Sequence, residues 1–142
     1  MKTYTDAYLF AFQKHGNTLD DEGKLYFDAH LVPVANILKI VTDDETIWMA
    51  GILHDTIEDT DTTYDELKKA FGKRVADLVN EVTHDGKKDS YGFYFPRLLS
   101  RDAYLIKFAD RISNLSRMSA WDKQRQKHYM GKSKFWKDGS DK

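Results

Sequence analysis

The spacing of apolar residues along this chain favours α-helices throughout. Val75, Leu78 and Val82, for example, recur at intervals that place them on one face of a helix. No run alternates between apolar and polar residues for long enough to indicate a sheet. The helical pattern covers residues 4–14, 31–40, 64–71, 75–82, 93–99, 102–118 and 121–136, together with a further segment that begins at about residue 42. The sequence therefore predicts an all-α protein.

Short polar motifs mark where several of these helices begin. Thr42 with Glu45, and Thr63 with Glu66, have the spacing of a capping box, in which two side chains satisfy the first free N–H groups of a helix. Pro33 lies in the first turn of its predicted helix, where its missing N–H costs nothing. We expect polar breaks, each containing glycine, over residues 16–27 and 84–90.

The helix that follows Thr42 carries the densest chemical signal. It is apolar nearly all round, which is typical of a buried central helix, and it ends abruptly in His54, Asp55, Glu58 and Asp59. On one continuous helix, residues four apart share a face, so His54 would stack on Glu58 and Asp55 on Asp59. Burying three carboxylates without partners is prohibitively costly, and a divalent cation would relieve that cost. Histidine mixed with carboxylates suits manganese, iron or zinc. The alternative is that these acids simply end a helix and face solvent.

Two further elements carry candidate residues. Asp110 and Asn114 lie four apart on an otherwise apolar helix, and Lys107 precedes Asp110 by three. One interpretation is an ordinary salt bridge between Lys107 and Asp110, worth a few tenths of a kcal/mol. The other makes Asp110 a metal ligand from a second helix and Asn114 a hydrogen-bonding partner of the substrate. His30, just before the helix at 31–40, is either a surface histidine or a further ligand.

Composition narrows the class of protein. The chain has 142 residues, enough for one domain with a core, and its net charge of −1 from 22 Lys and Arg against 23 Asp and Glu disfavours general nucleic-acid binding. An anionic substrate must therefore be held by local positive charges or by a metal. There is no cysteine and no apolar run of about 20 residues, so disulfides, thiolate zinc sites and a membrane span are not expected. The first residues include Asp6 and lack a signal-peptide stretch, so we expect a cytoplasmic protein.

Four stretches of the sequence match a known family. They are Phe27–His30, Gly51–Thr63, Val79–Thr83 and Lys107–Leu115. The chain resembles the HD-domain metal-dependent phosphohydrolases, and within them the hydrolase domain of RelA/SpoT-type alarmone enzymes and the free-standing small alarmone hydrolases. The resemblance implies an all-α HD-domain helical bundle of about seven or eight helices, with residues 1–137 as a single hydrolase domain and 138–142 as a polar tail.

The same resemblance implies a role for each candidate residue. His30, His54, Asp55 and Asp110 would be the metal ligands, usually for manganese. Glu58 and Asp59 would position and activate the attacking water, and Asn114 would contact the nucleotide. The implied reaction is removal of the 3′-pyrophosphate from guanosine tetra- or pentaphosphate. Among the remaining positive charges we expect Lys107, Arg111 and Lys24 to serve the substrate.

One loop departs from the family pattern. Small alarmone hydrolases carry an Arg-Lys pair before the first metal ligand, whereas residues 17–24 of this chain include Asp20, Asp21 and Glu22. An acidic loop would repel a polyphosphate unless Lys14 or Lys24 compensates. The departure leaves other hypotheses open: the same site acting on a deoxynucleotide, a nucleoside monophosphate or NADPH, or a non-catalytic HD binding module. The sequence does not indicate an oligomeric state.

Overall fold

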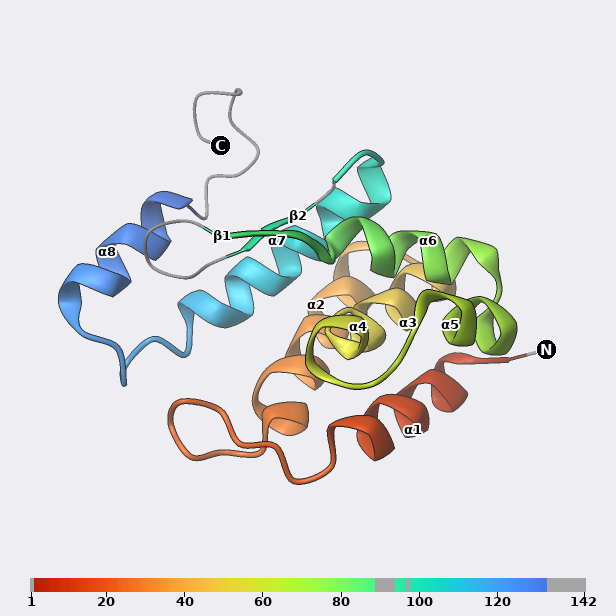
Figure 1. Cartoon of the computed structure of the whole chain (residues 1–142), viewed down its shortest axis with the longest axis horizontal. Helices are drawn as coiled ribbons and strands as arrows, with labels where there is room; N and C mark the ends of the chain where they lie inside the picture. The colour runs from red at the N-terminus through yellow and green to blue at the C-terminus, as the bar shows by residue number, and fades with distance from the viewer. Residues whose placement is uncertain (1, 89–93, 97, 133–142) are drawn as a thin grey trace.

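Helices packed around the short central helix α3 make up most of the described chain (Figure 1). The structure is a computed structural model that describes residues 2–88, 94–96 and 98–132. Its elements, in order, are α1 (Tyr4–His15), the π-helical turn η1 (Phe27–Leu31), α2 (Val32–Val41), α3 (Glu45–Leu53), α4 (Thr56–Asp59), α5 (Tyr64–Phe71), α6 (Lys73–Val82), β1 (His84–Lys88), β2 (Tyr94–Pro96), α7 (Arg101–Leu115) and α8 (Lys123–Lys132). The all-α prediction and the expected helix number are confirmed.

Helix α3 holds the core together. It packs against α1, α2, α6 and α7, and six of its nine residues are buried. Ile52 and Leu53 are completely shielded from solvent, as is Leu38 of the neighbouring helix α2. Burial on all sides explains why the segment is apolar nearly all round, and it leaves the C-terminal end of α3 deep inside the molecule.

Two expectations about α3 are wrong in detail. Asp44, not Thr42, is the residue that caps the helix, because the Asp44 carboxylate accepts a hydrogen bond from the Thr46 N–H at 3.0 Å. The helix also ends at Leu53 instead of continuing to residue 59. The Thr56 hydroxyl donates to the Leu53 carbonyl at 2.7 Å, so a side chain satisfies a carbonyl group that a continuing helix would have used. Residues 54 and 55 therefore form a turn between α3 and α4.

A small hairpin replaces one predicted helix and one predicted break. Strand β1 pairs with β2 in antiparallel fashion, so the helix expected over 93–99 is wrong for residues 94–96, and the break expected over 84–90 is wrong for 84–88. A three-residue strand is too short to show alternation, and antiparallel pairing satisfies the backbone of a segment without helical contacts. The two strands form the one sheet of the described residues and lie between α6 and α7 in sequence.

The C-terminal part of the chain follows the prediction with shorter helices. Helix α7 spans Arg101–Leu115 against an expected 102–118, and α8 spans Lys123–Lys132 against an expected 121–136. Residues 133–136 of that helix and the tail at 138–142 lie outside the described residues. Across the described chain, each helix is too short or too polar to traverse a lipid bilayer.

The contact between α2 and α3 gives a first testable prediction, at Gly51. A Cβ atom added there would lie 2.3 Å from Cδ1 of Leu38, whose side chain is fully buried and has no solvent to move into. We expect Gly51→Ala to lower the free energy of unfolding by about 1–3 kcal/mol, measured by urea denaturation. Gly131→Ala in α8 is the control: a Cβ there meets nothing within 4 Å, so stability should be unchanged or slightly raised. A Gly51→Ala variant as stable as the wild type would contradict the close packing.

Candidate metal centre

Four buried side chains from three parts of the fold converge on one point. His30 comes from η1, His54 and Asp55 from the turn after α3, and Asp110 from α7. One ligand atom from each lies within 4.8 Å of all the others. Nε2 of His30 lies 3.3 Å from Nε2 of His54 and 2.9 Å from Oδ1 of Asp110. Nε2 of His54 lies 3.2 Å from an oxygen of each aspartate. The structure thus brings together the four residues that the sequence singled out as candidate ligands.

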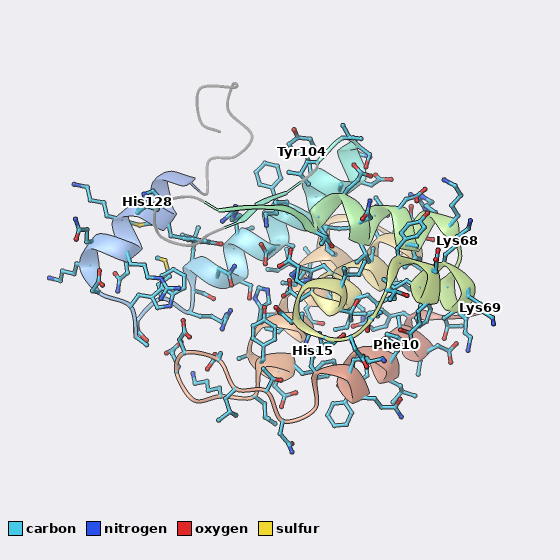
Figure 2. All side chains as sticks on the ribbon, viewed as in Figure 1. Phe10, His15, Lys68, Lys69, Tyr104 and His128 are labelled. Atoms are coloured by element: carbon cyan, nitrogen blue, oxygen red, sulfur yellow. The ribbon has the colours of Figure 1, made fainter. Side chains whose placement is uncertain are left out.

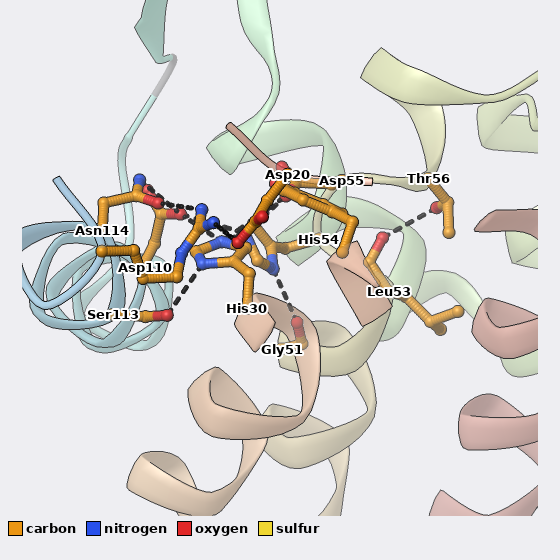
Figure 3. A network of polar contacts seen from close by, with 12 residues as sticks. Asp20, His30, Gly51, Leu53, His54, Asp55, Thr56, Asp110, Ser113 and Asn114 are labelled. Carbon is orange, nitrogen blue, oxygen red and sulfur yellow. Dashed lines mark hydrogen bonds and ion pairs between the residues drawn. The ribbon is translucent and has the colours of Figure 1, made fainter. Parts of the chain in front are cut away.

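Hydrogen bonds behind the rings aim both Nε2 atoms at this point. Nδ1 of His54 lies 2.7 Å from the Gly51 carbonyl, and a carbonyl only accepts, so Nδ1 carries the hydrogen (Figure 3). In the neutral ring, Nε2 of His54 then presents a lone pair to the two carboxylates. Nδ1 of His30 lies 2.8 Å from the Ser113 hydroxyl, a contact that holds this ring with Nε2 toward the same point. Such partners commonly orient histidines that bind a metal.

The arrangement fits a divalent cation. Two carboxylates meet two ring nitrogens at these distances, so the point where they converge strongly attracts a positive charge. The pKa values also indicate a site that favours positive charge. Burial alone would lower the pKa of His54, but the negative charges of Asp55 and Asp110 have the larger effect and raise this pKa well above its ordinary value. The pKa of Asp110 is held well below its usual range, since Lys107 and the two rings outweigh burial. Two nitrogen and two oxygen donors suit a first-row divalent metal.

Glu58 and Asp59 lie on α4 beside this cluster and are not part of it. The Asp59 N–H donates to the Asp55 carbonyl at 2.9 Å, so these two residues remain one helical turn apart although α3 ends at Leu53. Glu58 and Asp59 as whole residues are each partly open to solvent, whereas their carboxyl groups are largely enclosed by the surrounding chain. Burial of the carboxyl group and the nearby negative charge of Asp55 raise the pKa of Glu58 to about 7 and that of Asp59 to about 7. Each carboxyl group can therefore take up or release a proton near neutral pH.

The predicted substrate-binding residues come from α7 and from the loop after α1. Nζ of Lys107 lies 3.1 Å from Oδ2 of Asp110, so the salt bridge exists alongside the cluster. Asn114 lies with its amide nitrogen 3.4 Å from Asp110. Arg111 is buried, with its guanidinium carbon 4.9 Å from the centre of the Tyr129 ring of α8. Lys24 is exposed on the loop after α1.

His15 and His128 are not members of this cluster. His15 is buried at the end of α1, and neither of its ring nitrogens has a hydrogen-bond partner among the described residues. Burial lowers the pKa of His15, which is consistent with a neutral ring. Figure 2 shows His128 on α8 at one end of the molecule, and Lys68 and Lys69 on α5 at the opposite end.

Sequence analysis did not identify Tyr26, which contacts the centre directly. Its hydroxyl donates to Oδ2 of Asp55, and its ring lies 5.2 Å from that of His30. Burial and the charge of Asp55 raise the pKa of Tyr26 well above its ordinary value, so the phenol keeps its proton. The available signal was its position four residues before His30, one helical turn away.

The acidic loop is held against the segment that follows α7. The Asp20 carboxylate accepts a hydrogen bond from Arg117 at 3.0 Å. In the same way the Asp21 carboxylate accepts from the indole N–H of Trp121, and Glu22 accepts from the Ser119 hydroxyl at 2.6 Å. Lys14 does not compensate the loop, since its ammonium group pairs with Asp61 at 3.0 Å and Glu66 at 3.6 Å. The three acidic residues therefore hold the loop against the segment that follows α7.

Comparison with known proteins gives a consistent family. Residues 7–91 match the family model described as HD domain. A guanosine-3′,5′-bis(diphosphate) 3′-pyrophosphohydrolase of Aquifex aeolicus is 37% identical over 129 residues, which cover 85% of this chain and 18% of that protein. A protein of the same name from Danio rerio, MESH1, is 38% identical over 135 residues, 84% of this chain and 74% of that protein.

A solved structure agrees with these relatives. It belongs to a metazoan ortholog of SpoT that hydrolyzes ppGpp, and it superposes with a TM-score of 0.78 at 30% sequence identity, over 92% of this chain and 81% of that chain. The lengths differ among relatives: the chain spans about a fifth of the Aquifex aeolicus protein and about three quarters of the Danio rerio protein.

Proposed function

This chain belongs to the HD domain family, and from that premise we propose that it is a metal-dependent hydrolase that removes the 3′-pyrophosphate from guanosine tetra- and pentaphosphate. The observation that carries the proposal is the buried convergence of His30, His54, Asp55 and Asp110 next to two carboxyl groups with raised pKa. The relatives that cover most of this chain are named for that reaction, which supports the choice of substrate.

In this proposal the four clustered residues hold one divalent cation, for which the family resemblance favours Mn²⁺. When bound, the cation lowers the pKa of water and offsets negative charge on phosphate oxygens. Ser113 and the Gly51 carbonyl keep the two imidazole rings turned toward it. The Tyr26 hydroxyl orients the Asp55 carboxylate by donating to one of its oxygens.

Glu58 and Asp59 handle the proton of the attacking water. A carboxylate at the edge of the cluster accepts that proton, and a pKa near 7 allows it to do so at neutral pH and later to release it. We assign the base to Glu58 and the positioning of the water to Asp59. Lys107, whose charge acts on both Glu58 and Asp110, balances the negative charge of the site as the pyrophosphate approaches.

Asn114 contacts the nucleotide at the edge of the centre, where its amide lies beside Asp110. Arg111 of α7 and Lys24 of the loop after α1 act through their charge, by attracting a polyanionic substrate.

Product analysis on a panel of nucleotides tests the function. Protein loaded with Mn²⁺ is incubated with guanosine tetraphosphate, deoxynucleoside triphosphates, nucleoside monophosphates and NADPH, and products are identified by mass spectrometry. We expect pyrophosphate and GDP from the tetraphosphate. Inorganic phosphate from a monophosphate or from NADPH, with no turnover of the tetraphosphate, would show a different substrate. An absence of products throughout would favour a binding module.

The rate should fall on the acid side of neutrality. Burial and the charge of Asp55 raise the pKa of Glu58 to about 7, and the base works only in its deprotonated form. As pH falls through this pKa, kcat/KM should decline by up to about tenfold per pH unit, and a bound cation should move the decline to lower pH. Measurement at saturating Mn²⁺ checks this. A rate that rises toward acid would contradict the assignment of a carboxylate base.

A further inference from the structure

A pocket of about 340 Å³ lies beside the metal centre, between the loop after α1 and the segment after α7. Tyr26 and Asp59 line it on the side of the centre, and Asp20 and Arg117 line it on the loop side. Because the Tyr26 hydroxyl also bonds Asp55, one wall of the pocket is continuous with the cluster. A molecule with one end at the metal centre could therefore extend into this pocket.

The charges that line the pocket disfavour a phosphate as its occupant. Asp20 and Asp21 line the pocket with a single cationic residue, Arg117, and the third acid of the lining, Asp59, adds negative charge whenever it is deprotonated. A phosphate placed there would meet more negative than positive charge at short range. The pocket is therefore better suited to an uncharged part of a substrate, whereas phosphates are better placed at the cation and Lys107.

The guanidinium of Arg117 is held at both terminal nitrogens. NH1 donates to Asp20 at 3.0 Å, and NH2 donates to the Asn114 side-chain oxygen at 2.8 Å. The Asp20 side chain is only 2% exposed, and that of Arg117 is 16% exposed. The guanidinium carbon lies 5.5 Å from the centre of the Tyr26 ring. Anchoring at both terminal nitrogens fixes the plane of the group, which lines the pocket together with Tyr26.

We propose that Arg117 is the platform on which the nucleobase of the substrate stacks, and that Asp20 is its positioning residue. The proposal rests on the proposed function in requiring a nucleotide substrate. It accounts for the acidic loop: the carboxylate of Asp20 orients an arginine that arrives from the segment after α7. Bases stack well on guanidinium planes, and such stacking does not depend on an excess of positive charge.

Calorimetric binding of GDP and of inorganic pyrophosphate to the Mn²⁺-loaded protein tests the platform without turnover. We expect Arg117→Gln and Arg117→Lys each to weaken GDP binding about tenfold, because lysine keeps the charge but lacks the plane. Binding of pyrophosphate, which lacks a base, should be unchanged. Asp20→Ala should also weaken GDP binding selectively, and Asp20→Asn, which keeps an acceptor oxygen, should restore part of the affinity. Arg101→Lys, at a side chain 84% exposed, is the matched control.

The outcomes separate the platform from the function. Wild-type affinity for GDP in Arg117→Lys would show that charge alone matters, and a parallel loss of GDP and pyrophosphate binding would show a merely structural role; either overturns the proposal. Wild-type protein that binds no GDP overturns it as well. If GDP binding depends on Arg117 but no pyrophosphate is released from guanosine tetraphosphate, the platform stands and the proposed function fails.

Discussion

Asp55→Ala is expected to abolish both metal binding and turnover. The Asp55 carboxylate is one of four donors in the buried cluster, and its loss leaves two neutral rings and one carboxylate for the cation. Changes behind metal ligands typically cost about 10- to 100-fold in affinity, so loss of a ligand itself should weaken Mn²⁺ binding by more than about 100-fold. Titration of metal-free protein with Mn²⁺, followed by electron paramagnetic resonance, measures the affinity.

Asp65→Ala is the matched control for that variant. Asp65 is an exposed acid in the first turn of α5, outside the cluster, so its replacement should leave Mn²⁺ affinity and rate unchanged. Circular dichroism confirms that both variants keep their helices. Mn²⁺ affinity or pyrophosphate release near the wild-type level in Asp55→Ala would remove this residue from the metal centre.

Glu58→Gln should separate catalysis from metal binding. The amide has nearly the same shape as the carboxylate but accepts no proton from water at neutral pH. Removing a general base typically costs about 10²- to 10⁴-fold in rate, and we expect kcat to fall within that range. The affinity for Mn²⁺ should stay near the wild-type value, since Glu58 is outside the four-residue cluster.

Glu66→Gln on α5 serves as the control, because Glu66 contacts Lys14 near the surface and should not affect the rate. Rates are measured at saturating Mn²⁺ and saturating nucleotide, so that kcat is compared directly. Substantial activity in Glu58→Gln, with a corresponding loss in Asp59→Asn, would exchange the roles that we assign to the two carboxylates.

Much of the fold could be predicted because helical periodicity is a local property. The apolar faces of α1, α2, α5, α6 and α7 are visible in the sequence, and so is the burial of α3. The turn at His54 and Asp55 was not visible, since the carbonyl groups that end α3 are satisfied by side chains of Thr56 and His54. Periodicity alone extended the helix past this point. The hairpin was missed for a similar reason, because its shorter strand has only three residues.

Of the candidate site, too, only the residues that lie near one another in sequence could be predicted from local patterns. His54, Asp55, Glu58 and Asp59 stand out as a local cluster at the end of an apolar segment. His30 lies 24 residues before His54, and no spacing rule connects the two, so only the family resemblance joined them. Arg117 was not identified, because its importance depends on a contact with Asp20, 97 residues away in sequence. The loop looked repulsive because the sequence does not show which cation meets it.

The central claim, that one metal centre drives pyrophosphate release, is tested most directly by titrating the metal-free protein with Mn²⁺ in the presence of guanosine tetraphosphate. We expect the rate of pyrophosphate release to rise from background and to reach a plateau at one bound Mn²⁺ per chain, with GDP as the other product. A rate that does not depend on the metal, or release of inorganic phosphate in place of pyrophosphate, would contradict the claim.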